Sequence, residues 1–239
     1  DNNQKYGGTD AADNSGTLQY IRLEYTGFAF DEEHEANGIS FYGVGNGTIV
    51  DHCQAYKGSD DGFEFFGGSV NVSNLVAVSC SDDSFDWTEG WNGKGTNLVA
   101  YQEDKSTLGY DCDCLMECDN NGSNNAATPV AHPVLKNLIL VGNGGSKQGI
   151  RLRAGTEVEI DNAKVCGKGQ PLTVETALTE NALKNGTSKL TNITLTSSTN
   201  MSKDEIDRAV RDAEQFAEND RKLREEVENK NAADSVAYQ

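Results

Sequence analysis

One short motif occurs twice in this chain and constrains its fold more than any other feature. It is SDDGFEF from Ser59 to Phe65 and SDDSFDW from Ser81 to Trp87, so that acids align with acids and aromatic residues with aromatic residues. Self-similarity at a fixed period of about 20–50 residues is the signature of stacked structural repeats. The sequence therefore predicts a solenoid in which the two acidic segments lie one above the other.

The segments around the motif indicate that each repeat is built from β-strands. Alternating or β-branched runs recur between Gly, Asn and Asp corners. They cover residues 18–25, 38–42, 48–56, 62–66, 70–78, 97–102, 134–141, 149–153, 158–165, 171–175 and 190–196, with 112–119 as a third copy of the acidic segment. Because the copies follow one another instead of pairing as hairpins, we expect a mainly β fold, a right-handed parallel β-helix.

The C-terminal segment has a different composition and predicts a helix. All 25 glycines, all 3 prolines and all 6 cysteines lie before residue 200. Beyond it, apolar residues recur with a period close to 3.6, and Ser202 with Glu205 forms a capping box. We therefore expect a helix from residue 202 to about 229, and a division into a β-helix over 1–199 and a helical tail over 200–239.

Charge and hydropathy limit the classes of partner. The formal net charge of −18 argues against nucleic acids and anionic membrane surfaces, and it permits cations. No run approaches the ~18 apolar residues of a membrane span, so we expect no transmembrane segment. Cys112, Cys114 and Cys118 are the only cysteine cluster, and their spacing favours buried thiols or one disulfide over structural zinc.

The repeated acids form the main candidate site. In register, the carboxylates stack in three pairs: Asp60 with Asp82, Asp61 with Asp83, and Glu64 with Asp86. Like charges held ~5 Å apart repel by ~3 kcal/mol at an effective dielectric near 20. A hard cation such as Ca²⁺, or a raised carboxylate pKa of the kind that a catalytic acid needs, would offset this repulsion. Asp is also a common corner residue, so a structural role for the SDD pairs stays open.

Arginines and aromatic residues extend the candidate site. Arg151 and Arg153 lie on a later rung and could pair with Glu117, a third way of offsetting the repulsion. Trp87 and Trp91 flank the acids, and flat apolar faces beside carboxylates suit sugar stacking, although aromatic packing at the solenoid's edge is the alternative. In a catalytic version, Asp60, Asp61, Asp82 or Asp83 would act as acid, base or Ca²⁺ ligand, with Arg151 or Arg153 as electrostatic partner.

The front of the chain resembles a known family. GTLQYIRLEY, GSDDGFEFFGG, DDSFDWTEGW and GIRLRAGT are similar to bacterial secreted or lipid-anchored proteins, many from Bacteroidota, with a pectin-lyase-like parallel β-helix. The resemblance covers about residues 5–175. It implies an extracellular or cell-surface location and a β-helix with further turns before this chain's start, and it implies no established activity.

The tail resembles a different family. ITLTSSTNMSKDEIDRAVRDAEQFAENDRKLREEVENKNAADSVAYQ is similar to the Hsp70 chaperone's substrate-binding region, where the last strand runs into the lid helices. The resemblance covers about residues 191–239, so the chain looks chimeric. Three hypotheses follow: non-catalytic binding of a polysaccharide or Ca²⁺, a polysaccharide lyase or glycoside hydrolase, and a fragment of an Hsp70-type chaperone.

Overall fold

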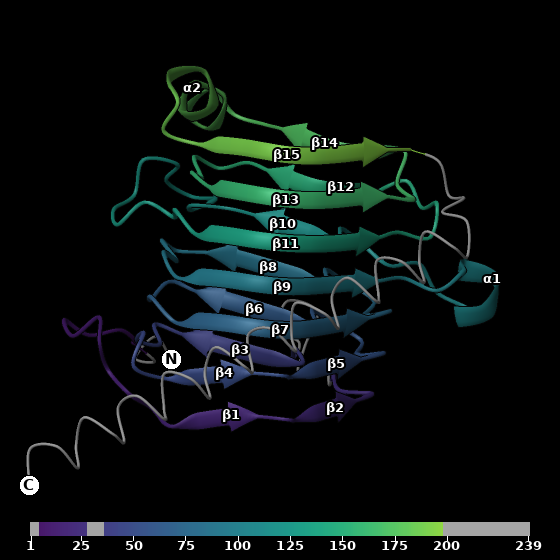
Figure 1. Cartoon of the computed structure of the whole chain (residues 1–239), viewed down its shortest axis with the longest axis horizontal. Coiled ribbons are helices and arrows are strands. Elements are labelled where there is room, and N and C mark those ends of the chain that lie inside the picture. Colours follow the sequence, from purple (N-terminus) through teal and green to yellow (C-terminus); the bar gives the residue numbers. More distant parts are fainter. Residues whose placement is uncertain (1–4, 28–35, 198–239) are drawn as a thin grey trace, which may run out of the picture. The chain divides into compact units, whose positions relative to one another are not determined.

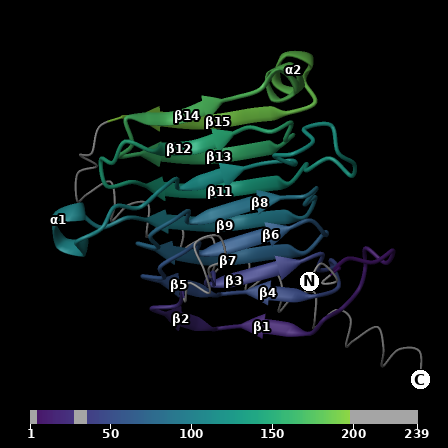
Figure 2. The same cartoon turned by 180° about the vertical axis from the view of Figure 1, so that it is seen from behind.

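The computed structural model describes residues 5–27 and 36–197. These residues belong to the first of two compact units, Asp1–Asn200. Their strands form two sheets of parallel strands that lie one behind the other, here called sheets A and B (Figures 1 and 2). The helix expected over 202–229 and the Hsp70-like tail lie outside the described residues.

Sheet A contains nine of the described strands. Its main path runs β1-β4-β7-β9-β11-β13-β15, and β2 and β5 continue the first two rungs. Their bounds are β1 (Thr17–Gln19), β2 (Arg22–Glu24), β4 (Ile49–Asp51), β5 (Gln54–Tyr56), β7 (Asn71–Val78), β9 (Lys94–Tyr101), β11 (Val134–Val141), β13 (Glu159–Cys166) and β15 (Lys189–Thr196).

Sheet B contains six described strands in the order β14-β12-β10-β8-β6-β3. Their bounds are β3 (Ile39–Tyr42), β6 (Phe63–Phe66), β8 (Phe85–Thr88), β10 (Met116–Cys118), β12 (Gln148–Leu152) and β14 (Gln170–Val174). Phe63 pairs with Phe85 and Glu64 with Asp86, which is the register expected from the repeated motif. The mainly β fold with parallel pairing is thus confirmed, and its right-handedness stays a prediction.

A chain of asparagine side chains fixes the bend in the long strands of sheet A. Asn74, Asn97, Asn137 and Asn162 have φ of 55–63°, a left-handed conformation that Asn tolerates better than most residues. The Nδ2 group of Asn97 donates to Asn74 Oδ1 at 2.9 Å, Asn137 to Asn97 at 3.0 Å, and Asn162 to Asn137 at 2.9 Å. The bonds connect successive rungs and therefore oppose slippage of one rung against the next.

The space between the sheets is filled by stacked apolar side chains. Phe65 lies between Phe41 and Trp91, with ring centroids 4.9 and 4.0 Å away. Phe63 stacks on Phe85 at 5.5 Å, one ring above the other as the repeat requires. All six cysteines are buried and none of them forms a disulfide, so the disulfide alternative is wrong.

Within the described residues, two helices interrupt the strands, and neither was expected from the sequence. α1 (Lys105–Leu108) leaves the strand ends after β9, and α2 (Ala177–Asn185) lies at the β14–β15 end of the stack (Figure 1). Thr179 and Ala182 are the buried residues of α2, which indicates that this short helix covers the last rung. No helix in the described part of the chain is long and apolar enough to cross a membrane.

Candidate functional site: an acidic face on sheet B

Strand alternation places a column of ionisable side chains on the outer face of sheet B. Phe63 and Phe65 of β6 point inward, so Glu64 between them points outward, and the same parity applies to Asp86 on β8. Glu64 pairs with Asp86, Asp86 with Glu117, and Glu117 with Arg151. The outer face therefore carries three successive acids followed by an arginine.

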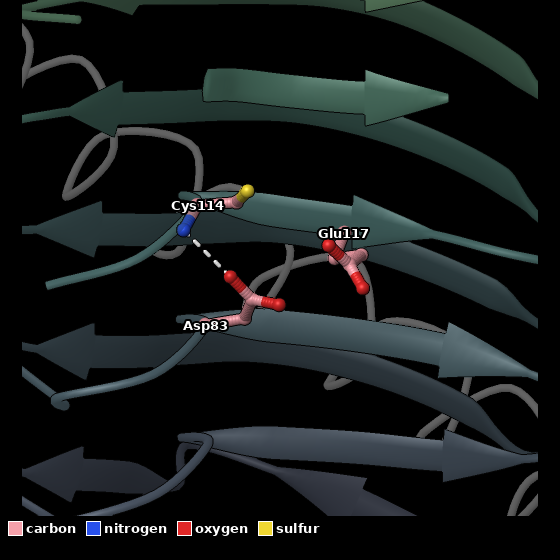
Figure 3. A group of neighbouring side chains, drawn as sticks. All are labelled: Asp83, Cys114 and Glu117. Atoms are coloured by element: carbon pink, nitrogen blue, oxygen red, sulfur yellow. Dashed lines mark hydrogen bonds between the residues drawn. The ribbon is translucent and has the colours of Figure 1, made fainter. Parts of the chain in front are cut away.

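Two further carboxylates lie at the corners that precede the strands. Asp61 and Asp83 are each only 5% exposed. Oδ1 of Asp61 accepts a hydrogen bond from the backbone N–H of Asp83 at 2.8 Å, 22 residues further along the chain, and Oδ1 of Asp83 accepts from the N–H of Cys114 at 2.6 Å (Figure 3). Each corner acid thus binds the backbone of the following rung. The structural role that the sequence left open for the SDD acids therefore applies to Asp61 and Asp83, each through its Oδ1 atom.

Burial makes these acids hard to ionise. It raises the pKa of Asp61, Asp83 and Asp86 well above the ordinary range, and the charges of neighbouring acids add to the effect. Burial also raises the pKa of Glu64 to about 7, although Asn37, which donates to Glu64 Oε2, opposes the shift. At neutral pH the cluster must therefore retain protons or bind positive charge.

The oxygen Oδ1 of Asp86 is the least satisfied atom of the cluster. It is buried and accepts no hydrogen bond from any residue that the structure describes. An unsatisfied buried polar group costs about 1–3 kcal/mol, more when it is charged, and native proteins contain few of them. At this point of the acidic column, a buried carboxylate oxygen is thus left unpaired by the described residues.

The carboxylate oxygens approach closely enough to share a cation. Three groups have oxygens within 4.8 Å of one another: Asp60, Asp61 and Asp82; Asp61, Glu64 and Asp86; and Asp82, Asp83 and Asp113. A fourth group contains Asp83, Cys114 and Glu117 (Figure 3). All six acids expected as metal ligands therefore occur in these groups, which are joined through shared members. Oxygen-only groups suit Ca²⁺, whereas a thiol does not.

The two arginines neutralise the other end of the column. Arg151 Nη1 lies 3.0 Å from Glu117 Oε1, and its Nε lies 3.0 Å from Glu175 Oε1. Arg153 contacts Glu117 Oε2 and places Nε 2.7 Å from Asp119 Oδ1. The expected pairing with Glu117 is confirmed. Glu117, Asp119 and Glu175 hold these two guanidinium groups, and their expected role as electrostatic partners of the SDD carboxylates stays a prediction.

The two tryptophans do not form a sugar-stacking surface. Trp87 and Trp91 are each 1% exposed. Their Nε1 atoms donate to Thr156 Oγ1 at 3.0 Å and to the Val70 carbonyl at 3.2 Å. The glycan-stacking prediction for both is wrong, because Trp87 shares the inward parity of Phe85 and Trp91 fills the core.

A different set of aromatic residues faces outward. Tyr42 on β3 and Phe66 on β6 are paired in register, and their rings stack at 4.5 Å with 5° between the planes. Tyr6 packs edge-on against Tyr42 at 5.1 Å. We call Tyr6, Tyr42 and Phe66 the aromatic step. Strand alternation in the sequence could have identified these rings, since Tyr42 and Phe66 have the parity of the outward residue Glu64. The prediction chose Trp87 and Trp91 instead.

Comparisons with known proteins agree with both resemblances. The model of a family described as a pectate-lyase-like β-helix domain matches residues 1–238. The chaperone protein DnaK of Thermoplasma volcanium is 51% identical over 57 residues, which are 24% of this chain and 9% of that chaperone. This small share does not carry a chaperone function to the chain. No solved structure matches.

Proposed function

Because the chain belongs to the pectate-lyase-like β-helix family, we propose that it is a carbohydrate-binding protein that holds Ca²⁺ on the acidic face of sheet B. The acidic face consists of Asp60, Asp61, Glu64, Asp82, Asp83 and Asp86. Family membership supports the carbohydrate-related role in general. The binding role and the cation rest on the site itself.

The observation that carries the proposal is the buried, unsatisfied Oδ1 of Asp86 among carboxylates whose oxygens lie within 4.8 Å. A divalent cation would pair this oxygen and offset the repulsion that raises the neighbouring pKa values. The group formed by Asp61, Glu64 and Asp86 is the favoured position, because Lys147 already contacts Asp113 and the arginines already contact Glu117.

The proposed cation site also provides a link to carbohydrate. Ca²⁺ takes six to eight oxygen ligands, and three carboxylates leave several positions for water or for sugar oxygens. Sites in extracellular modules bind Ca²⁺ with dissociation constants of about 10⁻⁴–10⁻³ M, which suits the secreted or cell-surface location that we propose for this protein. The role is non-catalytic in this proposal, since Arg151 and Arg153 are engaged by Glu117, Asp119 and Glu175.

Calorimetric titration of the whole chain with Ca²⁺ tests the proposal. We expect saturable binding to the wild type and a loss of at least about tenfold in affinity for Asp86→Asn, which removes a charge without changing shape. Asp161→Asn is the matched control, because Asp161 lies on β13 of sheet A. Absence of binding, or equal binding by Asp86→Asn, would contradict the cation site.

One observation favours a second candidate, a glycoside hydrolase or lyase on the same face. Burial raises the pKa of Glu64 to about 7, the range in which a general acid is effective at neutral pH. This candidate predicts release of reducing or unsaturated ends from polysaccharides, lost in Glu64→Gln. A panel that stays intact while Ca²⁺ binds would leave the binding role as the better account.

A further inference from the structure

The aromatic step lies beside the acidic face and presents accessible ring surface. Tyr6 is 43% exposed and Tyr42 is 52% exposed. Phe66 and Glu64 both point outward from β6 and are two residues apart, about 7 Å along a strand. A ligand chain that covered the step would therefore also run past the proposed cation position.

A cavity of about 400 Å³ adjoins the step, and Tyr6 and Phe66 form part of its wall. This volume is within the ~300–1,000 Å³ range of small-molecule sites. The cavity lies where β3, β6 and β8 end, and Figures 1 and 2 both place the N-terminal segment at this end of sheet B. Its walls are therefore formed by segments that are distant in sequence.

The N-terminal wall of the cavity is anchored to the sheet corners. The Tyr6 hydroxyl donates to Glu89 Oε2, and Ser69 Oγ donates to the Ala11 carbonyl at 2.7 Å. The N–H of Asn46 donates to the same carbonyl at 2.8 Å. These bonds tie residues before β1 to corners after β3, β6 and β8, so the cavity is a formed feature of the fold.

The lining combines aromatic rings with hydrogen-bonding side chains, and the charged ones among these named side chains are acidic. Asp10, Glu89 and the exposed amide of Asn92 surround the aromatic wall. Carboxylates and amides accept hydrogen bonds from hydroxyl groups, and a ring face packs against the C–H side of a sugar. The two acids repel a uronate, and the net charge of −18 acts in the same direction.

We propose that the aromatic step and its cavity form a subsite for an uncharged, hydroxyl-rich sugar ring within a polysaccharide. The inference rests on the proposed carbohydrate-binding function and adds the place and the sugar class. In this arrangement Tyr6 and Phe66, the two rings that line the cavity, pack against the sugar, and Tyr42 holds both of them in place through its ring contacts. Asp10, Glu89 and Asn92 bind the hydroxyl groups of the sugar. The acidic face and the step then bind successive parts of one glycan.

Saturation-transfer NMR and calorimetry on the whole chain test the subsite. The probes are neutral oligosaccharides built from glucose, mannose, galactose or xylose, with oligogalacturonate as the acidic comparison. We expect at least one neutral probe to bind and Tyr42→Ala to weaken it about tenfold, as the loss of one aromatic contact implies. Tyr42→Phe keeps the ring and should bind like the wild type.

Tyr101→Ala is the matched control, because Tyr101 is 41% exposed but lies on β9 of sheet A. Equal binding of every neutral probe by wild type and Tyr42→Ala would overturn the subsite and leave Ca²⁺ binding untouched. If Asp86→Asn lost glycan binding while Tyr42→Ala kept it, the sugar would lie on the acidic face, and the subsite would also be overturned. Absence of any glycan binding would overturn both the subsite and the carbohydrate-binding role.

Discussion

At the scale of single residues, the corner acids Asp61 and Asp83 each make a structural hydrogen bond and also lie close to other carboxylates that repel their negative charge. Asp83 binds the N–H of Cys114 through Oδ1, and its second oxygen points toward the side on which Glu117 lies (Figure 3). A carboxylate is therefore not interchangeable with any small polar residue at this corner. The hydrogen bond and the negative charge of Asp83 can be separated by substitution.

Asp83→Ala removes the acceptor and leaves a buried N–H unpaired. We expect it to lower the free energy of unfolding by about 1–3 kcal/mol. Asp83→Asn keeps an acceptor oxygen and should lose less stability; because Asp83 lies outside the favoured cation group, it should also weaken Ca²⁺ binding less than Asp86→Asn does. Urea unfolding followed by circular dichroism measures the stability of both variants. Equal stability of the two variants would show that the bond to Cys114 contributes little.

The raised pKa of Glu64 predicts how stability depends on pH without Ca²⁺. Its folded value of about 7 exceeds the ~4.3 of an unfolded chain, so the folded state binds more protons between these values. This contribution to stability is complete below pH ~4 and is lost as the pH rises through ~7, by at most about 4 kcal/mol.

The measurement is the melting temperature of wild type and Glu64→Gln between pH 4 and 8 in EDTA, at pH values spanning the window set by the two pKa values. The wild type should lose stability relative to the variant as the pH rises, and Ca²⁺ should reduce this difference. Parallel curves would mean that Glu64 ionises normally in the folded protein.

At the scale of elements, alternation allowed most of the strands to be predicted from the sequence. The strand expected over 134–141 is β11 (Val134–Val141), and the repeated motif gave the register of β6 on β8. The expected strand over 48–56 is divided into β4 and β5, because His52 has φ of 53° at the bend. The His residue did not allow this bend to be predicted from the sequence, whereas an Asn residue occupies the same bend in later rungs.

Two other features, α2 and the burial of Trp91, could not be predicted from the sequence for physical reasons. Thr176 precedes α2 but makes no side-chain cap bond and has φ of 75°, so the usual start signal of a helix is missing. The burial of Trp91 depends on its contact with Phe65, a partner on another rung that no local pattern identifies. The acidic face was predictable because its residues repeat. The aromatic step was missed although Tyr42 and Phe66 have the outward parity, because the prediction chose the tryptophans and because the third ring, Tyr6, lies outside the repeats.

The asparagine chain gives a prediction for the bend. Asn97→Ala should remove two side-chain bonds and place Ala at φ of 58°, costing about 2–4 kcal/mol. Asn97→Gly loses the same bonds without the backbone strain and should cost less. Chemical denaturation compares the two. A Gly variant no more stable than the Ala variant would exclude a contribution from the left-handed conformation.

At the scale of the whole β-helix unit, the outer face of sheet B has two electrostatic halves. From β10 to β14 the acids are paired with Arg151 and Arg153, and this half needs no added ion. Over β6 and β8, Glu64 and Asp86 lie beside Asp61 and Asp83 without an arginine among their described contacts. The fold thus concentrates uncompensated acid next to the aromatic step, where a cation and a glycan would both be stabilised.

The central claim is that Ca²⁺ binds at Asp61, Glu64 and Asp86. A crystal structure with a lanthanide in place of Ca²⁺ tests it most directly, since anomalous scattering locates the ion independently of the protein atoms. We predict an anomalous peak about 2.3–2.6 Å from carboxylate oxygens of these three residues, with Asp86 Oδ1 among the ligands. An acidic face without a peak, with Asp86 Oδ1 still unpaired, would contradict the account.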